Sequence, residues 1–407
     1  MVEKPLKIAI VAGEESGDIL GADIVRALRK TTGRDVRLVG VGGRHLQALG
    51  LTSLFDGGEI ALMGFSAVLR DLPRLIRRIS QTAKTIADER PDCLVTIDSP
   101  DFSLRVARKV RAANPSIPIV HYVCPSVWAW RPGRAAAMKP YVDHILCILP
   151  FEAKELARLG GPPGTYVGHR LAHDADVAAA ASAQAQPRDL SPDRVKTLLV
   201  LPGSRRGEVR RLINSFARTI SVLRARGNRL RLLLPTVPHV ADMVRASVVS
   251  WDEKPEIIVD PARKWQAFGK ADAALIASGT VSLELALAGV PMVSCYPLDP
   301  IARVAMPHLV KVWSALLPNL IADRALVPEF YTPYIVSENL ARQLEGLCGD
   351  TGLRAWQKDG FAEIGRRMAT ARLLMTRSRT TQLWPPMKAR TRTPGWRTSP
   401  ATSRWHG

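Results

Sequence analysis

The sequence predicts an α/β protein made of two doubly wound domains, each a parallel sheet covered by helices. Short apolar runs of strand length recur along the chain, and amphipathic segments separate them. The strand–turn–helix opening at residues 7–30 starts again at residues 197–208. A length of 407 residues with 46% hydrophobic residues suits two or three domains with full cores.

The first half opens with a strand at 7–12, a turn at 13–18 and an amphipathic helix at 19–30. The turn lacks GxGxxG, and its acidic residues would repel a pyrophosphate, so we expect no dinucleotide cofactor there. The other strands expected in this half lie at 37–43, 92–98, 117–123, 143–149 and 166–171.

Asp98 ends one of these strands. Ligands of open α/β sheets bind beyond the carboxyl ends of the strands, so Asp98 is a candidate general base. Asp101 is expected to cap the next helix, and the alternative is that both carboxylates are only caps. After the next strand, Trp128, Trp130 and Arg131 could line an apolar, anionic pocket or pack at a domain edge.

Residues 172–194 are rich in Ala, Gln, Asp, Ser and Pro, which predicts a linker. We place the domain boundary near residue 185, with a first domain at 1–185 and a second at 186–370. His173, Asp174 and Asp176 carry metal-ligand atoms, but a solvated linker explains them better, and we expect no metal site.

The second half begins with a strand at 197–201 and the loop 202–208. Gly203 and Ser204 can offer backbone N–H groups, and Arg205 can bind a diphosphate through two hydrogen bonds. Glu208 lies four residues after Ser204, one more than the standard capping box has. Further strands are expected at 230–235, 256–260, 273–277 and 290–296.

Ser278, Gly279 and Thr280 form a small-residue turn before a helix expected at 281–288, which Gly289 should end. A helix N-terminus with free N–H groups suits a phosphate. Glu284, one turn inside the helix, could reach sugar hydroxyls. The alternative is an ordinary N-cap, since Ser and Thr begin many helices.

The stretch 62–78 interleaves large apolar residues with arginines. It can lie in a membrane interface, or it can be an amphipathic helix packed on the sheet. No apolar run approaches the roughly 20 residues of a membrane-spanning helix, and the opening residues do not resemble a signal peptide. We therefore expect a cytoplasmic protein.

The net charge of +20 predicts an anionic partner, which could be nucleic acid, an anionic lipid surface or a phosphorylated substrate. The five cysteines are odd in number and form no CxxC. The first four, Cys93, Cys124, Cys147 and Cys295, have apolar, strand-like surroundings, which favour buried thiols in a reducing compartment over disulfides or metal ligands.

Nine short motifs, each weak alone, occur in an order that resembles the lipid-A-disaccharide synthase family over roughly residues 5–370. They are AGEESGD (12–18, followed by LGA at 20–22), GVGG (40–43), IDSPDF (97–102), PSVWAW (125–130), LPFE (149–152), VGH (167–169), LPGSRRGE (201–208), SGTVSLE (278–284) and LPN with VPE (317–329).

The resemblance implies the GT-B architecture, two Rossmann-like domains facing across a cleft. It implies an inverting transfer of 2,3-diacylglucosamine from its UDP derivative to the 6-hydroxyl of 2,3-diacylglucosamine 1-phosphate, with a β-1,6 link formed, UDP released and no cofactor. Asp98 would be the base, and Arg205 would neutralise the leaving diphosphate. The implied UDP-binding residues are Ser204, Arg205, Ser278, Gly279, Thr280, Glu284, Asn319 and Glu329, with Ser16 and Trp128 as acceptor-side candidates.

Both implied substrates have acyl chains, so the resemblance favours the interfacial interpretation of the stretch 62–78. The protein would lie on the cytoplasmic face of the inner membrane, bound to anionic lipid. The expected membrane contacts are Met63, Phe65, Val68, Leu69, Leu72, Arg74, Leu75 and Ile76, and the loop of Trp128 and Trp130 could add to them.

The chain departs from the family pattern in two places. Phe330, Tyr331 and Thr332 follow VPE, where the family has Leu-Leu-Gln. Residues 371–407 hold eight Lys or Arg, no acidic residue and three Trp, in place of an amphipathic helix. A reading-frame shift near residue 372 would explain this tail, and a native lipid-binding tail is the alternative.

Two other functions compete with this one. Another GT-B enzyme, such as a UDP-N-acetylglucosamine epimerase or a peptidoglycan glycosyltransferase, is disfavoured by IDSPDF and PSVWAW. A nucleic-acid-binding protein rests on charge alone, and we expect no nucleic-acid partner because the sequence carries no recognisable binding motif.

Overall fold

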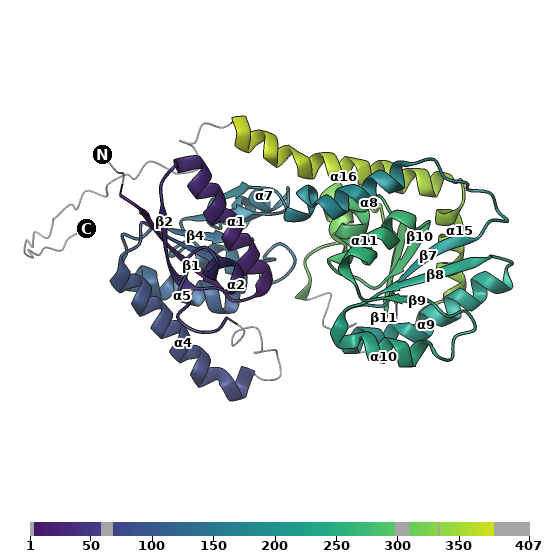
Figure 1. The fold of residues 1–407 in the computed structure, drawn as a ribbon, viewed down its shortest axis with the longest axis horizontal. Coiled ribbons are helices and arrows are strands. Elements are labelled where there is room, and N and C mark those ends of the chain that lie inside the picture. The colour runs from purple at the N-terminus through teal and green to yellow at the C-terminus, as the bar shows by residue number, and fades with distance from the viewer. Residues whose placement is uncertain (1–3, 58–67, 298–308, 333, 378–407) are drawn as a thin grey trace, which may run out of the picture.

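The computed structural model describes residues 4–57, 68–297, 309–332 and 334–377 of the chain. Within these ranges the protein has two lobes, each built on one six-stranded sheet (Figure 1). Every strand pair in both sheets is parallel.

The first sheet has the strand order β2-β1-β3-β4-β5-β6, so the order reverses between β1 and β3. Its strands are β1 (Leu6–Ala12), β2 (Val36–Val41), β3 (Cys93–Ile97), β4 (Ile119–Tyr122), β5 (His144–Cys147) and β6 (Gly164–Tyr166). The helices of this lobe are α1 (Glu15–Thr32), α2 (Arg44–Gln47), α4 (Val68–Glu89), α5 (Pro100–Ala113), α6 (Gly133–Met138) and α7 (Glu152–Arg158).

The second sheet has the order β12-β11-β10-β7-β8-β9, which reverses between β7 and β10. Its strands are β7 (Lys196–Leu201), β8 (Leu230–Pro235), β9 (Glu256–Ile258), β10 (Ala273–Ile276), β11 (Met292–Pro297) and β12 (Glu329–Thr332). The remaining helices are η1 (Arg170–His173), α8 (Ala175–Ala185), α9 (Arg206–Ala225), α10 (Pro238–Val248), α11 (Pro261–Lys270), α12 (Val281–Ala288), α14 (Leu317–Ala322), α15 (Ser337–Cys348) and α16 (Gly352–Arg377).

Alternate residues of the central strands supply the cores on the two faces of each sheet, because successive side chains of a strand point to opposite sides. In β1, Ile8 and Ile10 pack on the face of α1, whereas Ala9 and Val11 pack on the face of α4 and α5. In β7 the two faces receive alternate leucine and valine side chains in the same way. These strands are apolar on both sides, as the sequence predicts for buried parallel strands.

The segment 172–194, expected to be a linker, instead contains the second half of η1 and all of α8. Helix α8 packs against α11 and α12 of the second lobe. Gln184 near its end is buried, and its amide donates hydrogen bonds to the carbonyls of Phe268 and Ala271, both at 2.7 Å. The Ala-rich run therefore follows its high helix propensity once these tertiary contacts fix it.

The strand expected at 166–171 is also displaced. β6 spans Gly164–Tyr166, and the chain then turns at Gly168, whose φ is 89°. His169 caps η1, because its Nδ1 accepts the Leu171 N–H at 3.2 Å. A left-handed residue followed by a helix cap ends the strand early.

Helix α16 runs along the second lobe and reaches the first (Figure 1). The Lys358 ammonium donates to the Gln184 carbonyl at 2.9 Å, and the Tyr166 hydroxyl of the first lobe donates to the Met368 carbonyl at 3.2 Å. The helix backbone continues to Arg377, beyond the domain end expected at residue 370. Most of the basic tail, residues 378–407, lies outside the described residues.

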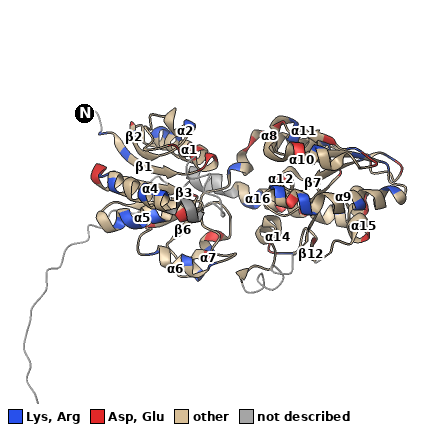
Figure 2. Ribbon diagram, turned by 90° about the horizontal axis from the view of Figure 1, so that it is seen from below, with Lys and Arg blue, Asp and Glu red and all other residues tan. Residues whose placement is uncertain are grey.

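Lys and Arg are spread over helices of both lobes, with acidic residues among them (Figure 2). All five cysteines are free and buried, which confirms the predicted burial of the first four and adds Cys348. Within the described ranges, no helix combines the length and apolarity needed to cross a bilayer.

Candidate active site

Asp98 lies at the carboxyl end of β3, beside the point where the strand order of the first sheet reverses. Its backbone is left-handed, with φ of 49°, and its N–H donates to the Tyr122 carbonyl at 3.0 Å. The next residue, Ser99, is also left-handed and donates to a Glu14 carboxylate oxygen at 3.3 Å. This contact ties the loop after β3 to the loop after β1.

The Asp98 carboxylate is half-buried and has no hydrogen-bond or ion-pair partner among the described residues. It caps no helix, because the N-cap of α5 is Ser99, and no side chain makes a capping bond there. Asp101 does not cap α5 either: its exposed carboxylate pairs with Arg134 at 2.9 Å. The alternative that both carboxylates are caps is therefore wrong.

A hollow of about 370 Å³ opens at the same end of the sheet. Four acidic residues line it: Glu14, Glu15 and Asp18 come from the turn after β1 and from α1, and Asp56 from a later loop. Arg44 also lines the hollow and pairs with Glu15 at 2.5 Å. Asp18 is occupied, because it accepts the N–H groups of Gly43, His45 and Leu46. Ser16, an acceptor-side candidate, is exposed in the first turn of α1.

In the second lobe, the loop between β7 and α9 places Arg205 at the carboxyl end of β7. Gly203 has φ of 115°, where a Cβ would come within 2.5 Å of a Glu208 oxygen, so the turn requires glycine. The Glu208 carboxylate accepts the N–H groups of Ser204 and Arg205 at 3.2 and 3.3 Å. It also pairs with the Arg205 guanidinium at 2.8 Å, leaving that side chain 82% exposed.

The loop Ser278–Gly279–Thr280 lies across the strand-order reversal from Arg205, since β7 and β10 are neighbours. Gly279 and Thr280 are exposed, and α12 begins at Val281 and ends at Gly289 with φ of 77°, as predicted. Glu284 is paired with Lys264 of α11 at 2.9 Å. The two loops and this carboxylate therefore line one edge of the second sheet.

Glu329 and Asn319 belong to one buried network. The Glu329 carboxylate accepts hydrogen bonds from the Asn319 amide at 2.7 Å, from the Ala315 N–H at 3.0 Å and from the Ser314 hydroxyl. The Asn319 amide also donates to the Val327 carbonyl, and its oxygen accepts two backbone N–H groups. All of its hydrogen-bonding positions are used within the lobe, so in this structure Asn319 holds Glu329 and offers nothing to a nucleotide.

Trp128 lies at the junction of the lobes. Its ring packs edge-on against Phe151 with centroids 5.0 Å apart, and both rings pack against the core of the second lobe. Its Nε1–H donates to Glu152 at 3.2 Å. The loop position therefore favours domain packing, the alternative stated above, over contact with an acceptor.

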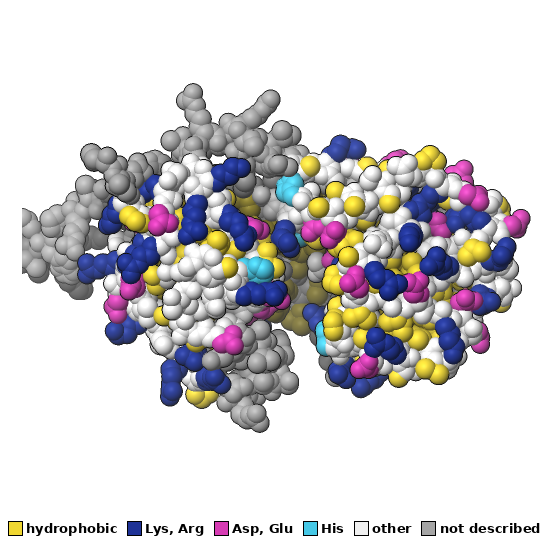
Figure 3. All heavy atoms as spheres, viewed as in Figure 1, with side chains coloured by type: hydrophobic (Ala, Val, Ile, Leu, Met, Phe, Trp, Pro, Cys, Tyr) yellow, Lys and Arg dark blue, Asp and Glu magenta, His cyan; other side chains and the backbone are white. Residues whose placement is uncertain are grey.

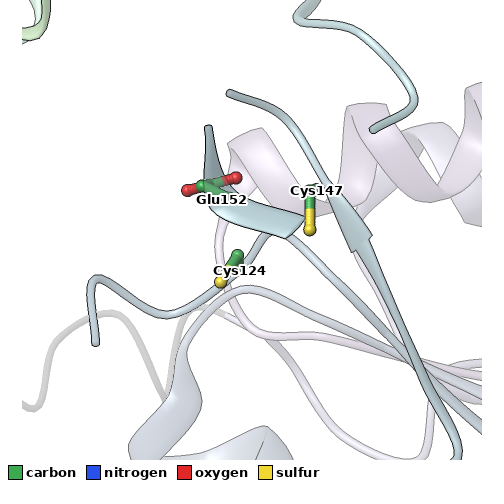
Figure 4. Close-up of side chains that lie close together, drawn as sticks. All are labelled: Cys124, Cys147 and Glu152. Carbon is green, nitrogen blue, oxygen red and sulfur yellow. The ribbon is translucent and has the colours of Figure 1, made fainter. Parts of the chain in front are cut away.

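Glu152 is 2% exposed and accepts the N–H groups of Ile148 and Leu149 through its other oxygen. Burial raises the pKa of its carboxyl to about 7. Cys124 and Cys147 lie beside it (Figure 4), and these three buried side chains are close enough to hold a metal ion. However, the carboxylate already accepts hydrogen bonds, and the interaction with Cys147 together with burial raises the pKa of the Cys124 thiol. The cluster therefore does not favour the deprotonated ligands that a metal requires.

The carboxyl ends of the two sheets meet at this junction. The Lys311 N–H, in the segment after β11, donates to the Ala129 carbonyl, in the loop after β4, at 2.8 Å. The molecular surface is hollowed between the lobes, with hydrophobic side chains in its depth (Figure 3). The carboxyl end of the first sheet, which carries Asp98, and the carboxyl end of the second sheet, which carries the loops after β7 and β10, thus both face the region between the lobes.

The expected membrane segment is described only in part. Met63 and Phe65 lie outside the described residues, and of Val68, Leu69 and Leu72 only the backbone is described, within α4. The helix continues to Glu89, well past the end expected at residue 78. Arg74 is exposed, Leu75 packs partly against the first-lobe core, and Ile76 is 49% exposed.

Sequence reasoning missed Glu152, Lys264 and Tyr331. Glu152 stood in a recognised motif, LPFE, but nothing local shows that it meets Trp128. Lys264 meets Glu284 only through the packing of α11 on α12. The Tyr331 hydroxyl lies in the FYT stretch that departs from the family. It is buried, it has no hydrogen-bond partner among the residues that the structure describes, and burial raises its pKa.

Comparison with known proteins gives a consistent result. The family model described as lipid-A-disaccharide synthetase matches residues 8–366. The chain is 45% identical over 364 residues to a lipid-A-disaccharide synthase of Bradyrhizobium diazoefficiens, covering 89% of this chain and 92% of the relative. It is 46% identical to that of Rhodopseudomonas palustris strain HaA2, with the same coverage of both chains. A relative from Rhodospirillum centenum is 40% identical, with 89% and 90% covered.

Solved structures share the fold at much lower identity. The crystal structure of MurG from Acinetobacter baumannii superposes with a TM-score of 0.52 at 12% identity, covering 92% of this chain and all of that one. A UDP-GlcNAc 2-epimerase from Neisseria meningitidis gives 0.53 at 14%, with 92% and 100% covered. With the two parallel sheets, these likenesses confirm the predicted GT-B architecture of two Rossmann-like domains.

Proposed function

The chain belongs to the lipid-A-disaccharide synthase family and is a glycosyltransferase of lipid A biosynthesis, and we propose that it joins UDP-2,3-diacylglucosamine to 2,3-diacylglucosamine 1-phosphate. The 6-hydroxyl of the acceptor attacks the anomeric carbon of the donor. UDP leaves, the anomeric centre inverts and a β-1,6 link forms. The observation that carries this proposal is that the carboxyl ends of the two sheets meet between the lobes, one with a carboxylate that is unpaired within the described residues, among acidic loops, and the other with Arg205 and exposed backbone N–H groups.

Asp98 is the general base in this proposal. Its carboxylate is unpartnered in the described structure, stands at the strand-order reversal and can accept the proton of a hydroxyl in the adjacent hollow. Ser16 lies in the first turn of α1, next to Glu14 and Glu15, and is proposed to contact the acceptor in the hollow beside them. Trp128 acts from the junction, by packing the lobes together.

Arg205 neutralises the leaving diphosphate. Its exposed guanidinium can leave Glu208 for a phosphate, because an exposed ion pair contributes only about 0–1 kcal/mol. The N–H groups of Ser278, Gly279 and Thr280 add donors at the start of α12, and the Ser204 N–H adds another once it leaves the Glu208 carboxylate. Glu284 binds the ribose hydroxyls, and Asn319 supports Glu329 beside the nucleotide.

The acylated substrates require a membrane-bound enzyme, and the proposed contact is the stretch 62–76 with the start of α4. Met63, Phe65, Val68, Leu69, Leu72, Leu75 and Ile76 would enter the interface, with Arg74 on anionic head groups. The proposed location is the cytoplasmic face of the inner membrane. The positive charge of the chain then serves lipid and diphosphate, and no nucleic-acid partner is proposed.

UDP release tests the reaction. The wild-type protein should release UDP only when both acylated substrates are present, and it should form a disaccharide 1-phosphate detectable by mass spectrometry. Conversion of the UDP-sugar without an acceptor would favour an epimerase instead. Tight binding of polynucleotide that falls steeply with salt, without UDP release, would favour the nucleic-acid alternative.

Sedimentation with anionic vesicles tests the membrane contact. A variant with Leu69→Glu and Leu72→Glu should stay in the supernatant while the wild type pellets with the vesicles. Val249→Glu with Val336→Glu is the matched control, because those side chains are 66% and 48% exposed on the second lobe. Equal pelleting of all three proteins would remove this segment from the proposal.

A further inference from the structure

A second cavity, of about 420 Å³, lies on the first lobe beside η1. This volume falls within the roughly 300–1,000 Å³ typical of small-molecule sites. Its lining comes from α1 (Leu20 and Asp23), from Tyr122 of β4, and from residues 167–170 and 173–175. None of the roles assigned above uses these residues, although the VGH motif at 167–169 forms one wall.

A backbone hydrogen bond connects the lining of the cavity to the proposed base, Asp98. Tyr122 lines the cavity, and the Tyr122 carbonyl accepts the N–H of Asp98. On the other side, η1 contacts α12 and α16 of the second lobe. A ligand seated here therefore lies on the acceptor side, next to the proposed base and close to the helix that begins at the Ser278–Thr280 loop.

The polar groups that remain available in this cavity favour an anion. Arg170 and His173 are exposed, and neither side chain has a hydrogen-bond or ion-pair partner in the part of the chain that the structure describes. The acidic neighbours are occupied. Asp174 caps α8 through the N–H groups of Asp176 and Val177, and Asp23 pairs with Arg26 at 2.9 Å.

His169 adds a neutral donor. Burial lowers its pKa to about 4, so the ring is uncharged near neutral pH. Its Nδ1 accepts the Leu171 N–H, which places the ring proton on Nε2. That Nε2–H has no partner among the described residues and belongs to a side chain that lines the cavity.

We propose that this cavity binds the phosphate monoester of the acceptor sugar, through Arg170, His173 and the Nε2–H of His169. The inference rests on the proposed function, because it assigns a place to the 1-phosphate of that acceptor. An arginine fork and two imidazoles match the oxygens of a phosphate monoester. Fixing the phosphate here would leave the rest of the sugar to reach toward Asp98.

Acceptor kinetics test the proposal. Arg170→Ala should raise KM for the 1-phosphate acceptor roughly 10- to 100-fold, the loss expected for a charge-assisted hydrogen bond. It should leave KM for the donor unchanged, and KM for an acceptor lacking the 1-phosphate should equal that of the wild type. Arg170→Lys should recover part of the loss, because it restores the charge without the fork.

Two further variants separate binding from folding. Arg342→Ala removes the same charge from an exposed position on α15 and should change neither KM. His169→Asn keeps an oxygen that can accept the Leu171 N–H but removes the Nε2–H, so it should raise KM only for the phosphorylated acceptor. Thermal unfolding of the Arg170 and Arg342 variants should match the wild type within about 2 °C, as for surface substitutions.

Several results would overturn the assignment. Unchanged KM in Arg170→Ala, or an equal loss with both acceptors, would show that the cavity does not recognise the phosphate. Lost binding to anionic vesicles with unchanged acceptor kinetics would assign the cavity to a lipid headgroup phosphate.

A wild type that releases no UDP would instead refute the proposed function, and the cavity would then be tested by calorimetry with glucosamine 1-phosphate and glucosamine. Phosphate-dependent binding that Arg170→Ala abolishes would support the site, and equal binding of both sugars would overturn it.

Discussion

The two sheets are built alike, but the loops at their strand-order reversals differ in chemistry. In the first lobe, the loops after β1 and β3 carry Glu14, Glu15 and Asp98, and Ser99 links them. In the second lobe, the loops after β7 and β10 carry Arg205 and small residues with exposed backbone. In the proposed function, the same scaffold thus presents a proton acceptor on one side and hydrogen-bond donors for an anion on the other, so function lies in the loops rather than in the fold.

Substitution of Asp98 should have the largest effect on the difference in chemistry between the two lobes. Asp98→Asn removes the proposed base with little change in shape, so kcat for UDP release should fall roughly 10²- to 10⁴-fold while KM for the donor changes little. Asp101→Asn, three residues on, is the matched control and should stay within about 3-fold of the wild type, because its exposed ion pair contributes little. Full activity of the Asp98 variant would remove the base from this lobe.

Arg205 tests the other lobe. Arg205→Ala should lower kcat by roughly 10²- to 10³-fold, as expected when one group that stabilises developing charge is lost, and should weaken UDP binding in calorimetry. Arg245→Ala is the control, because Arg245 also forms an exposed ion pair three residues away, with Asp242. If both variants bind UDP like the wild type, the diphosphate lies elsewhere.

Glu152 sharpens the comparison at the junction of the lobes. Its pKa is about 7 in the folded protein and near its usual 4.5 in the unfolded chain, so between these values only the folded state holds the proton. The free energy of unfolding should therefore fall as pH rises from 4.5 to 7, by about 3 kcal/mol from this group.

Urea unfolding at pH 5 and pH 7 measures this dependence. Glu152→Gln cannot titrate and should lose this contribution to the pH dependence. Glu155→Gln, on the same helix but partly exposed beside Arg158, should keep it. The same slope in all three proteins would mean that Glu152 ionises normally.

The smallest expected effect is at the link between the two loops of the first lobe. Ser99→Ala removes one hydrogen bond of 3.3 Å to Glu14, so kcat/KM should fall about 2- to 10-fold with KM for the donor unchanged. Ser116→Ala, which removes an exposed local bond to Asn114, is the control. A change as large as that of Asp98→Asn would give Ser99 a direct part in the reaction.

Local signals predicted much of this fold. Helix α12 has the predicted bounds, because an apolar helix between a small-residue turn and Gly289 has only one register. The predicted strands overlap eleven of the twelve observed ones, and β12 was missed because its four residues follow a motif that shows no apolar alternation. The domain boundary near residue 185 stays a prediction.

Long-range contacts explain what the sequence did not predict. The polar Gln184 belongs to the run that predicted a linker, yet its side-chain amide donates hydrogen bonds to backbone carbonyls more than 80 residues away. Asn319 belonged to a motif typical of nucleotide contact, but its bonds to Glu329 and the backbone show a supporting position. Polar residues have the same composition in a solvated loop and in a buried network, so only the tertiary structure separates the two.

Helix α16 constrains how the lobes can approach each other. It is fixed to the second lobe through α8 and α12, and it bonds to β6 of the first lobe through the Met368 carbonyl. Any rotation of the lobes that closes the groove over both substrates must therefore turn about α16 or bend this helix. We therefore expect substitutions at the contact between Tyr166 and Met368 to alter the amplitude of such a closure without touching either substrate.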